Sequence, residues 1–470
     1  MAEHKRMKTA FINLPAHRKL IRRYTCSYYA SNFLFPPLEL MYLAGIVQKW
    51  KNDDAIIIDA IAEHLDFKTV VERLKVFKPD LLVFMTGIET LSSDMLHAAT
   101  IKYALGRAKV ICFGYLPTQF PGEMLKYFPF IDFIIINEPE LVFSELYNKI
   151  KNNESIISLP GLVMRVDTSL YIGPPNERIK DLDSLPFPAR NLIHNSLYNE
   201  LFSPQPFTTI QSSRGCSAMC TYCIRTFGRE VVSRSIESLL NEIKEIVSKY
   251  HVKTIRFIDD NFCFNRNRLV TLCQSIISEK FSFRWSCLAR VDALNEEMVF
   301  LMRKAGCFRI YLGIETFSQR LLAAYKKNYN PQRVKALLKQ MKKNNIESIG
   351  FFLIGGVQTR REFEDDAQTA IASGLDYIVV EKISSYPGTP LFEQMKKEVH
   401  FTLHPYENRL KDRKKDFELC LWEKEFYQKF YFRWAYCFKM LARLLAYPQD
   451  LLVNFMDLVI FMLKRPGLRK

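Results

Sequence analysis

The chain has 470 residues, of which 48% are hydrophobic and 25% are charged, with a formal net charge of +16. This composition excludes a disordered or fibrous chain and predicts a soluble protein of about two or three domains. The eleven cysteines are irregularly spaced, and no apolar signal segment follows the polar residues 1–8. Both features favour a reducing compartment, so we expect a cytoplasmic protein. The basic residues are scattered along the chain, which indicates a solvated surface rather than a nucleic-acid site.

Residues 1–150 alternate short apolar runs with amphipathic segments. The runs cover residues 9–12, 55–58, 81–85, 110–113 and 133–136. Fully apolar strands between helices are typical of a parallel sheet that is covered on both faces. We therefore predict a doubly wound, Rossmann-like α/β domain over residues 1–150. Ligands of such sheets bind beyond the carboxyl ends of the strands, where this chain carries Asn13, Asp59, Thr86 and Gly114.

A polar stretch and a proline-rich segment follow, and they predict a linker over residues 151–200. From residue 207 the alternation resumes, with predicted strands at residues 207–211, 254–258, 284–288, 309–314, 349–354 and 377–382. These six strand–helix units are too few for an eight-unit barrel, which needs about 250 residues. A partial (β/α)6 TIM barrel within residues 201–400 fits better.

The remaining region, residues 401–470, is predicted to be a helical tail that is rich in aromatic and basic residues. Its most apolar part, residues 451–463, is too short to span a bilayer and contains Asn454 and Asp457. We favour a tail that caps the barrel mouth. A helix on the membrane surface is the open alternative, because the stretch is basic and amphipathic, so peripheral membrane contact belongs among the hypotheses.

Three cysteines share one loop after the first predicted barrel strand. Cys216, Cys220 and Cys223 have the spacing CxxxCxxC. Three thiolates can bind three irons of a [4Fe–4S] cluster and leave the fourth iron open, whereas a closed cluster needs four cysteines. A zinc site fits less well, because zinc takes four ligands and the next candidates along the chain are His251 and Cys263. Three unrelated thiols are the remaining alternative.

The cysteine spacing, with Tyr222 before the third cysteine, resembles the signature of the radical S-adenosylmethionine (radical SAM) superfamily. The resemblance implies that the open iron chelates SAM and that Tyr222 lies beside this cofactor. It also implies that the reduced cluster cleaves SAM to methionine and a 5′-deoxyadenosyl radical. Cys216, Cys220 and Cys223 are accordingly expected to be both the metal ligands and the catalytic residues.

Segments at the later strand ends resemble further motifs of this superfamily, in the same order along the chain. By family position, Asp259 and Asp260 are expected to contact the amino group of SAM. Arg290 is expected to pair with the SAM carboxylate, and Glu315 to face SAM or the substrate. Gly355 is expected to let the backbone approach the adenine. The structural alternatives are a helix cap for Asp260 and a surface ion pair for Arg290.

Residues 1–150 resemble the cobalamin-binding domain that many radical SAM enzymes carry. The resemblance rests on the segments 35–44, 78–80 and 185–190. It implies cobalamin as a further cofactor, with Asn13 and Gly114 among its contacts.

This domain also departs from the cobalamin-binding pattern. Some cobalamin domains ligate cobalt from below with a histidine in a loop after the first strand. Residues 13–17 lack that loop, and His17 is expected to be a surface residue. The later landmarks are altered at residues 113–115 and 137–140. Any cobalamin is therefore expected to have no protein ligand from below.

Together these resemblances imply a radical SAM enzyme that performs cobalamin-dependent C-methylation of a small-molecule or lipid-like substrate. They imply an electron donor such as flavodoxin or ferredoxin. Oxidative cyclisation or rearrangement is the alternative chemistry, and a cofactor-binding sensor or scaffold without catalysis is the alternative from another class. An RNA-modifying methylthiotransferase needs three further N-terminal cysteines, and the chain offers only Cys26 and Cys112 there. Nucleic acid is therefore not an expected partner.

Overall fold

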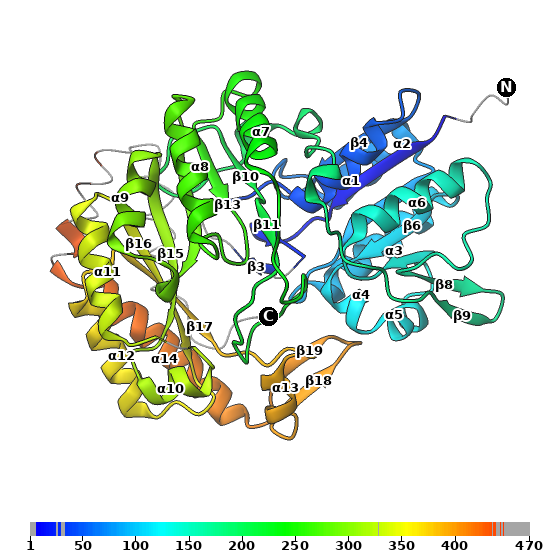
Figure 1. Cartoon of the computed structure of the whole chain (residues 1–470). Coiled ribbons are helices and arrows are strands. Elements are labelled where there is room, and N and C mark those ends of the chain that lie inside the picture. The colour runs from blue at the N-terminus through cyan, green and yellow to red at the C-terminus, as the bar shows by residue number, and fades with distance from the viewer. Residues whose placement is uncertain are drawn as a thin grey trace.

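The computed structural model describes residues 6–24, 27–29, 33–327, 329–434, 436–438, 442 and 445. Figure 1 shows two sheets with helices around them, one formed by the blue and cyan first part of the chain and the other by the green and yellow middle part. The α/β class and the order of the two units are those that the sequence predicts. Among the described residues, no helix is long and apolar enough to cross a membrane.

The first sheet has a core of parallel strands in the order β4-β1-β5-β6-β7. Their bounds are β1 Lys8–Asn13, β4 Asp54–Asp59, β5 Leu81–Met85, β6 Lys109–Phe113 and β7 Phe133–Ile135. The helices around it are α1 Leu38–Gln48, α2 Phe67–Phe77, α3 Leu91–Leu105, α4 Tyr115–Gln119, α5 Pro121–Tyr127 and α6 Pro139–Lys151.

Successive residues of each strand point to opposite faces, and both faces of the first sheet are buried. Phe11 and Val83 pack against α1 and α6, whereas Ile12 and Phe84 pack in the core that contains α2 and α3. Burial on both sides explains why the strands read as continuous apolar runs. The doubly wound arrangement is therefore as predicted.

Part of the segment expected as a linker joins this sheet. The antiparallel strands β8 Leu162–Val166 and β9 Ser169–Ile172 extend it beyond β7, and a turn with Asp167 at φ 54° connects them. The sequence did not indicate this hairpin, because β9 is largely exposed and has no apolar run. Short 3-10 helices follow at Leu182–Ser184, Arg190–Leu192 and Asn195–Leu197. The domain boundaries stay a prediction.

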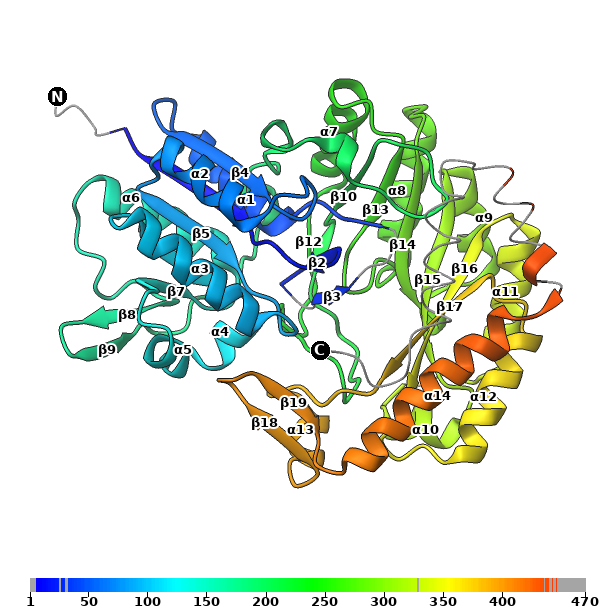
Figure 2. The same ribbon diagram turned by 180° about the vertical axis from the view of Figure 1, so that it is seen from behind.

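The second sheet consists of six parallel strands that are neighbours in chain order. They are β10 Phe207–Ile210, β13 Thr254–Phe257, β14 Arg284–Arg290, β15 Cys307–Glu315, β16 Glu347–Ile354 and β17 Tyr377–Lys382. No pairing between β10 and β17 is present among the described residues, so the barrel stays open. This is the predicted partial (β/α)6 barrel (Figure 2).

The helices of the barrel lie on the outer face of its sheet. They are α7 Ile236–Lys249, α8 Arg266–Ser278, α9 Glu296–Lys304, α10 Gln319–Ala324, α11 Gln332–Lys343 and α12 Arg360–Ala372, with a 3-10 helix at Val291–Ala293. Several begin at a residue whose side chain accepts a backbone N–H of the first turn, namely Ser235, Asn265, Asn295 and Thr359. Such caps satisfy helix donors that have no partner within the helix.

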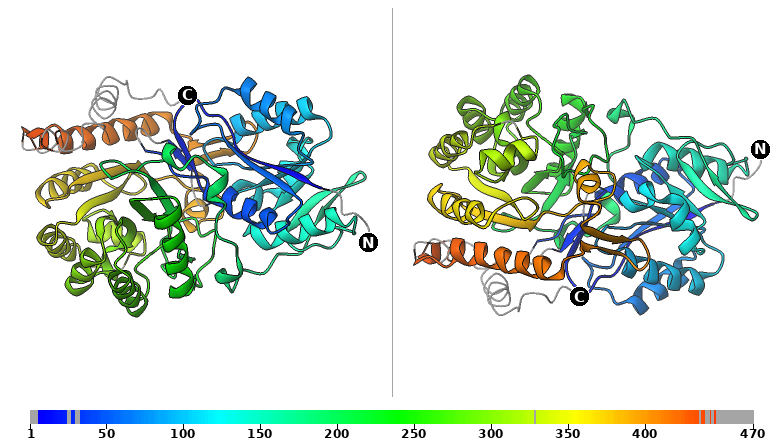
Figure 3. Two further views of the ribbon diagram at one scale, coloured as in Figure 1. Left: turned by 90° about the horizontal axis from the view of Figure 1, so that it is seen from above. Right: turned by 90° about the horizontal axis from the view of Figure 1, so that it is seen from below.

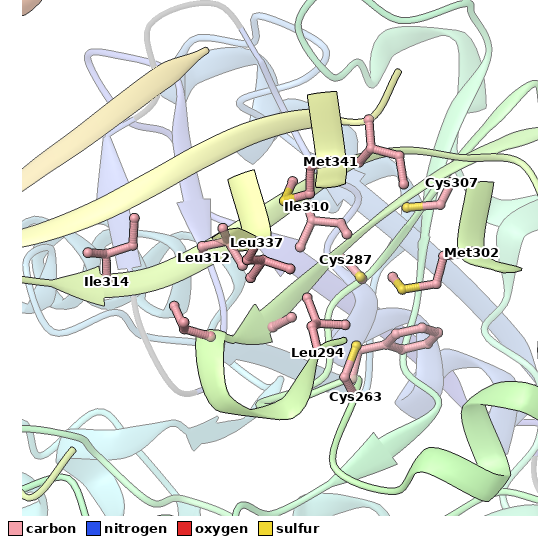
Figure 4. Close-up of a cluster of buried hydrophobic side chains, with 14 of the residues drawn as sticks. Cys263, Cys287, Leu294, Met302, Cys307, Ile310, Leu312, Ile314, Leu337 and Met341 are labelled. Atoms are coloured by element: carbon pink, nitrogen blue, oxygen red, sulfur yellow. The ribbon is translucent and has the colours of Figure 1, made fainter. Parts of the chain in front are cut away.

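The core between this sheet and its helices contains several cysteines. Figure 4 shows Cys263, Cys287 and Cys307 beside Leu294 and Met302. Burial raises the pKa of the Cys287 thiol well above its usual value, and the neighbouring thiols add to the effect. These cysteines are therefore core side chains, and Cys263 is not available as a fourth ligand for Cys216, Cys220 and Cys223.

A residue before the barrel fills the interior of the sheet toward its amino end. The buried carboxylate of Glu200 accepts hydrogen bonds from Ser286 Oγ at 2.9 Å and from Tyr311 Oη at 2.6 Å. It also lies 3.4 Å from Arg309 Nη1. These partners satisfy the charge of Glu200, which would be costly to bury alone. Because Glu200 fills the amino end of the barrel, a ligand would have to bind at the carboxyl ends of the strands.

The described part of the tail covers a sheet edge instead of the barrel mouth. Helix α14, Arg413–Tyr431, lies along β17 (Figure 2). The hydroxyls of Tyr427 and Tyr431 accept the N–H groups of Val380 and Ile378 at 2.9 and 3.0 Å. An edge strand has unpaired backbone groups, and these tyrosines satisfy some of them. The cap that we favoured is wrong for α14, and residues 451–463 lie outside the described residues.

The carboxyl ends of the two sheets meet each other (Figure 3). The hydroxyl of Tyr115, directly after β6, donates to the carbonyl of Pro387, which follows β17. Arg23 Nη1, in the loop between β2 Leu20–Arg22 and β3 Ser27–Tyr29, donates to the Ile258 carbonyl at 3.2 Å. Beyond Pro387 come α13 Pro390–Met395 and the hairpin β18 Val399–Thr402 and β19 Glu407–Leu410. Phe401 of this hairpin stacks on Phe120 at 5.4 Å.

Candidate active site

The three predicted cluster ligands lie on one loop at this junction. Residues 215–231, hereafter the cluster loop, connect β11 Ser213–Arg214 to its antiparallel partner β12 Val232–Ser233. Cys220 is buried, Cys216 is half-buried and part of Cys223 reaches the solvent. Desolvation, together with the neighbouring Cys220, raises the pKa of the Cys223 thiol to about 12.

The donor set of this loop fits an iron–sulfur cluster better than a zinc ion. Cys220 is close enough to Cys216 and Cys223 to add to the burial that raises the pKa values of these two thiols, so their thiolates would need a nearby positive charge. In the described part of the chain, no three His, Cys, Asp or Glu side chains surround one position for a metal ion. A [4Fe–4S] cluster does not require this, because each thiolate binds a different iron.

The two aspartates after β13 hold the start of the cluster loop. Buried Asp259 accepts the Ser212 N–H at 2.6 Å and the Ser213 hydroxyl at 3.0 Å, and Asp260 accepts the Gly215 N–H at 3.0 Å. Burial raises the pKa of both carboxyls. The observed partners of Asp259 thus lie just before the loop, and the partner of Asp260 is the first residue of the loop. Asp260 is not a helix cap, and the contact of both aspartates with SAM stays a prediction.

Gly215 is at a position that only glycine can occupy. Its φ is +93°, and a Cβ atom there would lie 2.2 Å from the Glu230 carbonyl oxygen. Such a close approach of backbone excludes a side chain. The cluster loop is therefore narrow at its base, and its first residue is held firmly.

Arg290 reaches the cluster loop but already has a carboxylate partner. Its Nε and Nη2 atoms donate to Asp292 at 2.9 and 2.7 Å, whereas Nη1 lies 3.5 Å from the Cys220 sulfur. This side chain is thus close to the predicted cluster, as the sequence suggested. The two guanidinium nitrogens that could bind the SAM carboxylate together donate to Asp292 in this structure.

Glu315 forms the centre of a polar group beside the loop. It has φ 65°, a left-handed conformation that is uncommon for a residue with a side chain. Its Oε1 atom accepts a hydrogen bond from Lys327 Nζ at 2.7 Å, and Lys327 also donates to the Gly313 carbonyl at 2.7 Å. Burial, followed by the charge of Glu315, raises the pKa of Tyr222, so this tyrosine is nearby. No sequence motif indicated Lys327.

Gly355 lies at the carboxyl end of β16, with φ +97°. Its N–H donates to Gln358 Oε1 at 3.1 Å, and a Cβ atom would lie 2.8 Å from Leu419 of α14. Gln358 and Thr316 in turn donate to Asp366 at 2.9 and 2.7 Å. Asp366 therefore connects the ends of β15 and β16, and burial raises its pKa to about 7. Sequence patterns did not single out Asp366.

The polar residue predicted at the end of β1 belongs to a closed network. Asn13 Nδ2 donates to Asp59 at 2.8 Å, and Arg22 Nη1 donates to Asn13 Oδ1 at 2.7 Å. Arg22 also forms a buried ion pair with Asp94 at 2.6 Å. Hydrogen bonds within the protein thus occupy both the oxygen and the nitrogen of the Asn13 amide.

The glycines that follow β5 and β6 are buried, at positions where neighbouring chain segments pack closely. Gly114 has φ 135°, and a Cβ atom there would lie 2.6 Å from the Thr86 carbonyl oxygen. A Cβ atom on Gly87 would lie 2.5 Å from Ser27. His17 is exposed, as the sequence predicts.

Comparison with known proteins now adds to this geometry. Residues 210–370 match the family model of the radical SAM superfamily. An uncharacterized methyltransferase of Pyrococcus horikoshii is 31% identical over 365 residues, which cover 76% of this chain and 78% of that protein. The chain belongs to the radical SAM superfamily. It is therefore an enzyme, and its membership implies a [4Fe–4S] cluster and SAM.

Two further comparisons place the radical SAM protein among larger enzymes. The anaerobic magnesium-protoporphyrin IX monomethyl ester cyclase of Cereibacter sphaeroides is 24% identical over 379 residues, covering 78% of this chain and 61% of that enzyme. The solved structure of OxsB, a cobalamin-dependent SAM radical enzyme with aqua-cobalamin and SAM bound, has a TM-score of 0.70 at 15% identity. It covers 89% of this chain and 66% of OxsB. This likeness confirms the fold.

Proposed function

We propose that this radical SAM enzyme is a cobalamin-dependent methyltransferase that acts on carbon of a small, largely apolar substrate. One observation carries the proposal: the cluster loop lies where the carboxyl ends of the two sheets meet. Tyr115, at the end of β6, is close enough to Cys223 for the thiol to affect its pKa, although burial is the larger cause. Ligands bind at these ends in both kinds of sheet.

In this proposal Cys216, Cys220 and Cys223 hold the cluster, and Glu315 and Lys327 bind SAM. The methionine end of SAM carries an ammonium and a carboxylate. Glu315 and Lys327 present the complementary charges side by side, 2.7 Å apart, with Tyr222 beside them. Lys327 joins Arg290 as a proposed partner of the SAM carboxylate; each cation has a carboxylate partner in this structure, Asp292 for Arg290 and Glu315 for Lys327. Gly355 remains the proposed neighbour of the adenine.

Cobalamin would rest on the edge of the first sheet, beyond the ends of β5 and β6 near Gly87 and Gly114, because ligands of such sheets bind at the carboxyl ends of the strands. When bound, this cofactor would supply the methyl group. Asn13 is saturated by Asp59 and Arg22, and His17 is exposed, so neither is suited to ligate cobalt. We expect the electron paramagnetic resonance spectrum of the Co(II) form to show no splitting from a protein nitrogen. Such a splitting would contradict this part of the proposal, as would a protein that takes up no cobalt.

Radical-mediated oxidative cyclisation is the second candidate, since one relative is named as a cyclase. The two reactions differ in the atoms that the substrate gains or loses. Methylation transfers a methyl carbon from SAM to the product, whereas cyclisation removes hydrogen and adds no carbon. SAM labelled with ¹³C in its methyl group therefore distinguishes them once a substrate is found. In either case the enzyme needs a reductant, for which we propose a flavodoxin or ferredoxin.

The cysteine triplet provides the direct test of the proposed chemistry. We expect the anaerobically reconstituted protein to absorb near ~400 nm and to release 5′-deoxyadenosine when it is reduced with SAM. Replacing Cys216, Cys220 and Cys223 together with Ala should abolish both signals. Cys437→Ala, which changes an exposed cysteine in the tail, is the matched control and should leave both intact. A triple variant that retains a full cluster contradicts the assignment.

A further inference from the structure

Arg214 is buried directly before the cluster loop and is bound by two carboxylates from the first domain. Its Nη1 atom lies 2.9 Å from Glu138 Oε2, and its Nη2 atom lies 2.5 Å from Glu140 Oε1. Its Nε atom donates to Gln211 at 2.9 Å. All three nitrogens of the guanidinium thus have partners. Burial alone would lower the pKa of Arg214, but Glu140 and Glu138 raise it above its ordinary value.

The two glutamates come from the start of α6 and not from the barrel. Glu138 precedes the helix and makes no side-chain cap to it, and Glu140 is in its first turn. The guanidinium also lies over the rings of Phe227 at 4.9 Å and Tyr42 at 5.8 Å. Phe227 belongs to the cluster loop and Tyr42 to α1. We call Arg214, Glu138 and Glu140 the interdomain clamp.

The clamp is placed to control the cluster loop and not only to join two domains. Gly215 and Cys216 directly follow Arg214, and the tight turn at Gly215 leaves little freedom between them. The Cys216 N–H donates to the Gly228 carbonyl at 3.2 Å, near the other end of the loop. A shift of Arg214 therefore moves the first cluster ligand. Desolvation offsets much of the attraction in a buried ion pair, so net stability alone is a weak reason for this one.

We propose that Arg214 is a positioning residue that sets the place of the cluster loop against the first domain through Glu138 and Glu140. The spacing between the cluster and the end of the first sheet is then determined by this clamp. The proposal rests on the proposed function in one respect, namely that the loop binds the cluster.

The test compares Arg214→Lys and Glu140→Gln with the wild-type chain. Lysine retains the charge but loses the fork that binds two carboxylates. In the apo-protein, trypsin cleavage after Arg225 and Arg229 in the loop should become about tenfold faster in Arg214→Lys, and less so in Glu140→Gln. In the reconstituted protein, release of iron to a ferrous chelator should also become about tenfold faster.

Arg309→Lys is the matched control. Arg309 is buried and binds Glu347 through two nitrogens at 2.9 and 2.7 Å, but it lies toward the amino end of the barrel. It should leave both rates within about twofold of wild type. The proposal is overturned if neither Arg214→Lys nor Glu140→Gln accelerates loop cleavage, or if Arg309→Lys accelerates it equally. A wild-type chain that binds no cluster refutes the proposed function instead, and the trypsin rates still test the clamp.

Discussion

The carboxyl ends of the two parallel sheets carry polar side chains of two different kinds. At the first sheet, Arg22 binds Asn13 and Asp94, so these buried groups satisfy one another. At the second sheet, Cys216, Cys220 and Cys223 lie together as free thiols and form no disulfide. The polar groups named at the first edge therefore have their partners within the chain. The second edge also contains such pairs, for example Glu315 with Lys327, but we propose that its three thiols take their partner from outside the chain.

The largest effect on stability is expected when the buried ion pair of Arg22 and Asp94 at the first sheet is broken. Arg22→Met leaves the carboxylate of Asp94 buried without its cation, which should cost about 3–5 kcal/mol in the free energy of unfolding. Denaturant unfolding of the apo-protein measures this loss. Arg22→Met combined with Asp94→Leu should recover only part of the stability. It removes both charges, but it also leaves the hydroxyls of Thr86 and Thr90 without their acceptor. An Arg22→Met variant as stable as wild type would contradict the structural role of the network.

A somewhat smaller effect is expected at the second sheet, on ligand affinity. Lys327→Met should weaken SAM binding by about 2–5 kcal/mol, since it removes the cation that we propose to bind the SAM carboxylate. Arg290→Ala should weaken SAM binding less, because the Arg290 side chain is 18% exposed and that of Lys327 only 5%, so solvent screens the charge of Arg290 more. Anaerobic calorimetry on both variants measures which of them binds SAM more weakly. The reverse order would make Arg290 the main partner of the SAM carboxylate.

Asp366, which connects two strand ends of the second sheet, should make stability depend on pH. Burial raises its pKa from 3.8 to about 7. The folded state therefore binds this proton more tightly, and its contribution to stability is present at low pH and is lost as the pH rises toward 7. Between pH 5 and 7, we expect wild type to lose about 1–2 kcal/mol relative to Asp366→Asn. Parallel denaturant curves over this range would show that Asp366 does not titrate there.

The smallest effect is expected at the edge of the second sheet. Tyr431→Phe removes the hydroxyl that bonds to both the N–H and the carbonyl of Ile378. It should lower the free energy of unfolding by about 1 kcal/mol. Tyr103→Phe, which alters a tyrosine that is 77% exposed, is the control and should change nothing measurable. A loss no larger than that of the control would mean that α14 covers β17 only through its apolar face.

The sequence alone determined the elements whose signals are local. Strands that are buried on both faces appear as apolar runs, so β1, β5 and β16 were predicted within a few residues. The cysteine triplet could also be recognised, because its three ligands share one loop. The antiparallel strand β9 has no such signal, since most of its residues face solvent.

Only the tertiary structure decided which partner each polar side chain has. Asp259 was expected near SAM, yet its hydrogen bonds go to Ser212 and Ser213. Glu140 and Arg214 are 74 residues apart in the sequence but form one ion pair. The physical reason is that apolar burial follows the period of a single element, whereas an ion pair or hydrogen bond depends on two segments that folding brings together. A single sequence contains the first kind of information and not the second.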